Sequence, residues 1–152
     1  MADAMEQLYQ QVILDHARTR QGEGELAEFG GESFQINPTC GDQVTLRVQL
    51  DATGGVIENL GWTGQGCSIS QASLSVMHEL VAGQSVQRAQ ELGGYFSELM
   101  AARGKELEPA RIEALEDASA FTGVARYPAR IKCALLGWMA LRDALVQAQA
   151  RA

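Results

Sequence analysis

The sequence predicts an α+β fold: a small three-stranded antiparallel sheet with helices packed on one side. Two observations indicate this class. Over residues 43–50 (QVTLRVQL), apolar and polar residues alternate, as they do in a half-buried strand, whereas after residue 67 apolar residues recur every three or four positions, as on one face of a helix. The chain has 152 residues, enough for one hydrophobic core, so we expect a single domain over residues 1–152.

Three segments are expected to form the sheet. Residues 43–50 form one strand, the turn DATGG follows, and residues 56–64 return as the second strand of a hairpin. Residues 33–36 are expected to add the third strand. The predicted helices cover residues 3–17, a segment from Cys67 to near Gly83, residues 86–102, residues 108–121 and a long segment after Pro128.

Charge and hydropathy exclude several classes of partner. The net charge is −7 and no cluster of lysine or arginine stands out, so we expect no nucleic-acid partner and no binding to an anionic membrane. No apolar run approaches the roughly 20 residues that a membrane-spanning helix needs. The first residues carry acids early and arginines late, the reverse of a secretory signal, so we expect a cytoplasmic protein.

Three cysteines, Cys40, Cys67 and Cys133, are separated by 27 and 66 residues. No two of them form a CxxC pair, so a zinc ribbon is excluded, and an odd number cannot pair fully within one chain. Spacing alone leaves open three unrelated buried thiols. The local sequence favours a shared site: Cys40 lies in a turn, and Cys67 and Cys133 are expected in the first turns of helices, where the helix dipole stabilises a thiolate.

Asp42 is a candidate fourth ligand because it lies two residues after Cys40, and Gly41 allows the backbone between them to bend. Three thiolates and one carboxylate are a donor set that zinc accepts in tetrahedral geometry. The alternative is that Asp42 is an Asx-turn or capping residue. Arg130, close to Cys133 in the sequence, would offset the negative charge of such a site.

The two histidines, His16 and His78, are expected to have packing or surface roles. His78 lies 11 residues after Cys67, which is about 16 Å along a continuous helix, too far to share a metal with it.

Three motifs in order, each with one cysteine, resemble segments of the SufU family, relatives of the IscU-type iron–sulfur scaffold proteins. They are NPTCGDQVTLRVQL, GQGCSISQASLSVM and ARIKCALLGW, and LYQQVILDHARTR is similar to the family's first helix. IscU-type chains carry a His-Cys pair at the third cysteine, where this chain has Lys132-Cys133. The SufU type also has an insertion between the second and third cysteine regions, which the separation here fits.

The resemblance implies an IscU/SufU-like fold and a zinc ion bound by Cys40, Asp42, Cys67 and Cys133. It implies a zinc-dependent sulfurtransferase that accepts persulfide sulfur from a SufS-type cysteine desulfurase and passes it to downstream iron–sulfur assembly proteins. In the family the acceptor is the cysteine that corresponds to Cys40, and Arg130 matches the arginine that helps to release it from zinc. Two alternatives remain: a scaffold that binds a [2Fe-2S] cluster at the same ligands, and a structural zinc protein without transfer chemistry.

Overall fold

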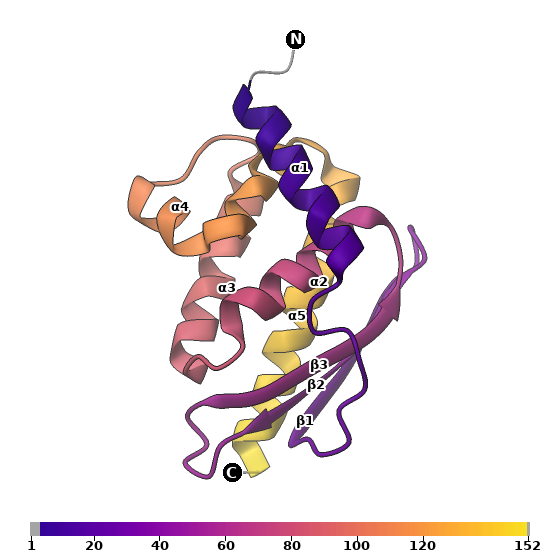
Figure 1. The fold of residues 1–152 in the computed structure, drawn as a ribbon, viewed down its shortest axis with the longest axis vertical. Helices are drawn as coiled ribbons and strands as arrows, with labels where there is room; N and C mark the ends of the chain where they lie inside the picture. The colour runs from indigo at the N-terminus through magenta and orange to yellow at the C-terminus, as the bar shows by residue number, and fades with distance from the viewer. Residues whose placement is uncertain (1–3, 152) are drawn as a thin grey trace.

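A computed structural model of the protein describes residues 4–151 and has the predicted α+β class (Figure 1). Within these residues, no helix combines the length and apolarity needed to cross a membrane. In chain order the elements are α1 (Ala4–Thr19), β1 (Gly31–Asn37), β2 (Asp42–Leu50), β3 (Ile57–Gln65), α2 (Ser68–Val81), α3 (Val86–Ala101), α4 (Pro109–Leu115), the 3-10 helix η1 (Glu116–Arg126) and α5 (Pro128–Arg151).

The sheet has three antiparallel strands, as predicted, and the strand order is β1-β2-β3. Asn37 pairs with Asp42, so β1 and β2 are joined by a loop of residues 38–41, which we call the hairpin tip. On the other side of β2, Gln43 pairs with Gln65 near the end of β3. This register brings the hairpin tip and the start of α2 to the same end of the sheet.

The hydrophobic core lies between the sheet and the helices. Apolar side chains alternate along β2 toward the interior, where Val44, Leu46 and Val48 are buried. Figure 1 shows α5 running along this face of the sheet. The approach is close, because a Cβ added to Gly31 would lie 2.0 Å from the carbonyl oxygen of Ala144.

Part of the segment 20–30, which connects α1 to β1, pairs with the free edge of β3 and then reaches the outer face of the sheet, where Arg47 donates a hydrogen bond to the carbonyl of Leu26 (3.1 Å). The backbone carbonyl of Trp62 in β3 accepts a hydrogen bond from the backbone N–H of Gly24 (2.8 Å), and its backbone N–H donates to the carbonyl of Gly22 (3.1 Å).

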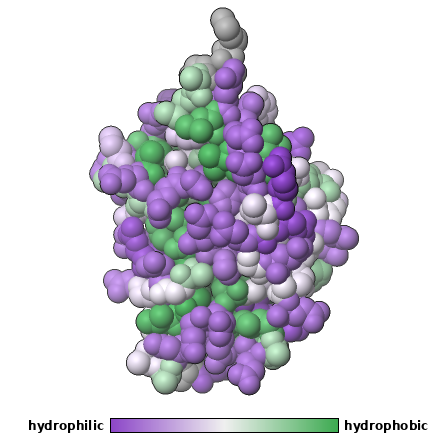
Figure 2. All heavy atoms as spheres, viewed as in Figure 1, coloured by the Kyte–Doolittle hydropathy of each residue, from purple (hydrophilic) through white to green (hydrophobic). Residues whose placement is uncertain are grey.

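Figure 2 shows that hydrophilic residues cover most of the visible surface and that hydrophobic residues form smaller, separated groups.

Two boundary predictions were wrong. The single helix expected over 108–121 is divided into α4 and η1, and Glu116 at the junction has a φ of +47°, which interrupts the α-helix. The last helix begins at Pro128 rather than after it, because proline is favoured at the first helical position. Cys133 is therefore the sixth residue of α5 and lies in its second turn, not its first.

Candidate metal centre

Cys40 lies on the exposed hairpin tip. The loop is closed by the carbonyl of Asn37, which accepts hydrogen bonds from the backbone N–H groups of Cys40 (3.3 Å) and Gly41 (2.8 Å). Gly41 has a φ of +74°, a conformation that favours glycine, and a Cβ there would meet no atom within 4 Å. Cys40 is therefore held by a tight turn but remains open to solvent.

Asp42, the first residue of β2, is fully buried. Its Oδ1 accepts the backbone N–H of Cys67 (2.8 Å), and its Oδ2 lies 3.9 Å from the Sγ of Cys67. A Cβ on Gly66 would lie 2.2 Å from Oδ1, so the glycine makes room for the carboxylate. Asp42 is thus a cap for the start of α2, and it keeps one oxygen directed toward the sulfur atoms.

Cys67 is the N-cap residue of α2, as the sequence predicted, and is half-buried. Its carbonyl accepts hydrogen bonds from the Ser70 hydroxyl (3.0 Å) and the backbone N–H of Gln71 (3.1 Å). The free N–H groups at a helix start favour negative charge on a nearby sulfur or carboxylate oxygen. The Cys67 sulfur and the Asp42 carboxylate both lie close to these N–H groups.

Cys133 is fully buried, and its Sγ lies 3.5 Å from the Sγ of Cys40. Burial is the largest of the effects that raise the pKa of Cys133 well above its ordinary value, and hydrogen bonds to Asp42 and to the other two cysteines act in the same direction. The predicted stabilisation of its thiolate by a helix start does not apply in the second turn. Burial therefore disfavours the thiolate of Cys133, and a coordinated metal ion would favour it.

These side chains form a cluster that can hold a metal ion. The ligand atoms of Cys40, Asp42 and Cys133 all lie within 4.8 Å of one another. Cys67 stands beside this group, in contact with Asp42. Thiolates about 2.3 Å from a tetrahedral zinc ion are roughly 3.7 Å apart. The separations of 3.5 Å between the sulfurs of Cys40 and Cys133 and of 3.9 Å between Cys67 and Asp42 fit such a site.

Two further residues, Arg130 and Asn37, lie close in sequence to residues of the cluster. Arg130 lies in the first turn of α5 and is exposed, and its guanidinium forms no hydrogen bond or ion pair with another residue of the described range 4–151. Asn37, which the sequence assigned only to a turn, is buried, and its Nδ2 lies 3.9 Å from the Sγ of Cys133. Its position just before the cysteine turn was the only available signal for this contact.

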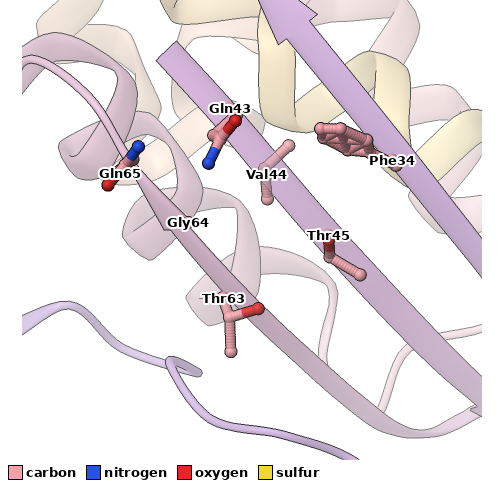
Figure 3. A pocket seen from close by; sticks show the side chains of 7 residues that line it. All are labelled: Phe34, Gln43, Val44, Thr45, Thr63, Gly64 and Gln65. Atoms are coloured by element: carbon pink, nitrogen blue, oxygen red, sulfur yellow. The ribbon is translucent and has the colours of Figure 1, made fainter. Parts of the chain in front are cut away.

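A shallow hollow of about 420 Å³ opens on the outer face of the sheet. Figure 3 shows side chains from three neighbouring strands around it. The lining residues are Phe34, Gln43, Val44, Thr45, Thr63, Gly64 and Gln65. Gln43 directly follows Asp42, and Gln65 precedes Cys67 by two residues, so the hollow lies at the same end of the sheet as the candidate metal centre, on the face opposite to the buried Asp42.

The histidines are separate from this centre. His78 is half-buried, and its Nε2 donates to the carbonyl oxygen of Leu60 (3.1 Å), which agrees with the predicted packing role. Burial lowers the pKa of His78, although the hydrogen bond to Leu60 acts in the opposite direction. His16, in α1, is buried, and its two ring nitrogens lie within hydrogen-bond distance of Ser75 in α2 and Asp117 in η1.

The hairpin tip and the start of α2 bring cysteine and aspartate side chains together at one end of an α+β fold. These side chains form the candidate metal centre. The family described as the NifU-like N-terminal domain matches residues 8–134, so the chain belongs to this family. The resemblance to SufU and IscU chains is confirmed by individual relatives.

The chain is 38% identical over 146 residues to the zinc-dependent sulfurtransferase SufU of Bacillus subtilis, covering 94% of this chain and 92% of that protein. It is 42% identical to the iron-sulfur cluster assembly scaffold protein IscU of Streptococcus pyogenes, covering 91% of this chain and 82% of that protein. The crystal structure of FiSufU from Fervidobacterium islandicum AW-1 superposes with a TM-score of 0.80 at 34% identity, covering 92% and 98% of the two chains.

Proposed function

We propose that this protein is a zinc-dependent sulfurtransferase that accepts persulfide sulfur from a SufS-type cysteine desulfurase for iron–sulfur cluster assembly. The observation that carries the proposal is the exposed thiol of Cys40 beside the buried side chains of Asp42 and Cys133. An exposed thiol can meet a donor protein, and buried ligands can retain a metal ion. The name of the Bacillus subtilis relative supports the same activity.

Zinc would be held by Cys40, Asp42, Cys67 and Cys133. This donor set suits zinc because it combines soft sulfur ligands with one carboxylate oxygen. Zinc when bound keeps coordinating thiols deprotonated at neutral pH. The buried Asp42 contributes a negative charge that is fixed in place by its hydrogen bond from the N–H of Cys67.

In the proposed transfer, the Cys40 thiolate attacks the outer sulfur of a cysteine persulfide on the desulfurase. A new S–S bond forms on Cys40, the S–S bond of the donor breaks, and the donor cysteine leaves as a thiolate, so electrons balance without an external oxidant. Cys40 is best placed for this reaction because it is the exposed cysteine, whereas Cys67 is half-buried and Cys133 is buried.

Arg130 would act as a positioning cation at this centre. It lies in the same helix as Cys133, three residues before it, and its exposed guanidinium is unpaired among the described residues. A cation there favours the negative forms of the nearby thiols and carboxylate. We expect it to assist the release of Cys40 for transfer.

We place the protein in the cytoplasm and expect downstream iron–sulfur assembly proteins to receive the sulfur. All three cysteines are free, and this chemistry needs reduced thiols, which a cytosolic environment maintains.

The alternative is a scaffold on which a [2Fe-2S] cluster is built, because the Streptococcus pyogenes relative is named as one. The two functions would use the same ligands but leave different metals in the purified protein. A colourless protein with one zinc per cysteine centre supports sulfur transfer, and a brown protein with iron and sulfide supports the scaffold.

The transfer itself is tested with a cysteine desulfurase, free cysteine and mass spectrometry of the acceptor. We expect a sulfur adduct of about 32 Da on Cys40 of the wild-type protein, since a persulfide is a reversible modification that mass spectrometry detects. Cys40→Ala should show no adduct and no stimulation of the desulfurase. An adduct on Cys67 or Cys133, with stimulation by Cys40→Ala unchanged, would contradict the proposal.

A further inference from the structure

A second group of potential metal ligands lies away from the cysteines, where α1, α2 and η1 meet. His16, near the end of α1, is 5% exposed. Its Nε2 lies 2.9 Å from Oδ2 of Asp117 in η1 and 3.2 Å from Oε2 of Glu79 in α2. The three ligand atoms all lie within 4.8 Å of one another. We call these residues the His16 cluster.

The charges in the His16 cluster do not balance. Two carboxylates converge on one imidazole nitrogen, which can offer a single proton, and no arginine or lysine within residues 4–151 pairs with either of them. The remaining partner of Glu79 is a neutral amide, Nε2 of Gln21, at 3.0 Å. By contrast, each of the other carboxylates in an ion pair of this structure faces an arginine. These pairs are Asp15–Arg18, Glu23–Arg20, Glu32–Arg47, Glu91–Arg88, Glu98–Arg111 and Glu6–Arg126.

The other imidazole nitrogen is held in a way that suits a metal ligand. Nδ1 of His16 lies 2.8 Å from the Oγ of Ser75, a fully buried hydroxyl that also accepts the backbone N–H of Gln21 at 3.0 Å. A hydroxyl oxygen has two lone pairs, so Ser75 can accept from both groups. With the proton on Nδ1, the lone pair of Nε2 faces the two carboxylates, and histidines that bind metals are usually oriented by such an outer hydrogen bond.

We propose that the His16 cluster is a second metal site, free of thiols, for a divalent first-row ion such as Mn²⁺, Fe²⁺ or Zn²⁺. One imidazole and two carboxylates are a donor set that these ions accept, and the partly exposed carboxylates leave positions for water. Binding would displace any proton on Nε2 to solvent. Glu79 is 12 residues after Cys67, about 18 Å along the helix, so the two sites lie at opposite ends of α2.

The test uses the chain of residues 1–152 with one equivalent of zinc already bound. The protein is titrated with Mn²⁺, and binding is followed by the EPR signal of free aqueous Mn²⁺. We expect one further Mn²⁺ to bind per chain. Asp117→Asn and Glu79→Gln should each weaken binding by more than about tenfold, because even outer partners of metal sites are worth roughly 10- to 100-fold in affinity. Both side chains are about half exposed, so the fold should tolerate these changes.

Matched controls are Asp143→Asn in α5 and Glu91→Gln in α3, two carboxylates outside the cluster. Both should bind Mn²⁺ like the wild type. Mn²⁺ should also raise the melting temperature of the wild type and of the controls but not that of Asp117→Asn, since a ligand of the native state stabilises it by mass action. Absence of Mn²⁺ binding in the wild type, or equal binding by Asp117→Asn, would overturn the proposal.

Discussion

The cysteine centre and the His16 cluster are built in opposite ways. The proposed ligands of the cysteine centre lie in short motifs: Cys40 in a hairpin tip, Asp42 at a strand start, Cys67 at a helix start and Cys133 in the second turn of α5. The residues of the His16 cluster come from three helical elements, each near an end of its helix, and no shared motif connects them. The first kind of site can be read from turn and helix-start residues, whereas the second exists only when the helices pack.

The largest expected effect comes from removing a buried ligand of the cysteine centre. Cys133→Ser should lose zinc and lower the free energy of unfolding by about 3 kcal/mol, because loss of a metal is among the causes of the largest single-substitution effects. Cys67→Ser should act in the same direction. Zinc content by elemental analysis and urea unfolding would measure both effects.

The control for these variants is Asp117→Asn, which should retain the zinc of the cysteine centre. If both cysteine variants keep zinc and unfold like the wild type, the four-ligand centre does not exist.

Asp42→Ala should weaken zinc binding without abolishing it, because water can take the place of an oxygen ligand more easily than that of a thiolate. The variant also leaves the N–H of Cys67 without its acceptor. Competition with a chelator would give the change in zinc affinity, which we expect to be about 10- to 100-fold. Unchanged affinity would mean that Asp42 serves only to cap α2.

Gly66→Ala tests the same role of Asp42 without removing a proposed ligand. The added methyl group would lie 2.2 Å from Oδ1 of Asp42, so the carboxylate must move and zinc affinity should fall by roughly tenfold. Gly94→Ala in α3 is the matched control, since a Cβ there meets nothing within 4 Å and alanine suits a helix. Equal zinc affinity of the two variants in the chelator assay would refute this steric role.

The smallest expected effect concerns His78, which shares α2 with Glu79 but has a backbone carbonyl as its partner instead of carboxylates. Burial holds its pKa below the ordinary value of 6.5, so the unfolded chain binds a proton that the folded chain does not. This contribution to stability is present above about pH 6.5 and is lost as the pH falls further. His78→Gln should therefore lose less stability than the wild type between about pH 7 and pH 5.5 in urea unfolding. An identical loss in both proteins would exclude His78 as its source.

Much of the fold was predictable because local patterns and packing agree. The alternation along β2 matches its burial, and the turn residues around Cys40 form the loop that their chemistry favours. The break at Glu116 was not predictable, since a 3-10 helix and an α-helix share similar apolar spacing over a few residues.

The two clusters also differ in how far the sequence indicates them. Motifs indicated the four residues that we propose as ligands of the cysteine centre, although Cys133 was placed one turn too early in α5. The cluster of His16 with Glu79 and Asp117 depends on contacts across 63 and 101 positions of the chain. Such contacts arise from tertiary packing and leave no local pattern.

Zinc X-ray absorption of the protein with one equivalent of zinc tests the central claim most directly. If the cysteine centre binds zinc as proposed, the first shell contains three sulfur atoms at about 2.3 Å and one oxygen at about 2.0–2.2 Å. The same spectrum is expected for Asp117→Asn, because the His16 cluster does not compete for the first equivalent. A first shell made only of nitrogen and oxygen atoms in the wild-type protein would contradict the account.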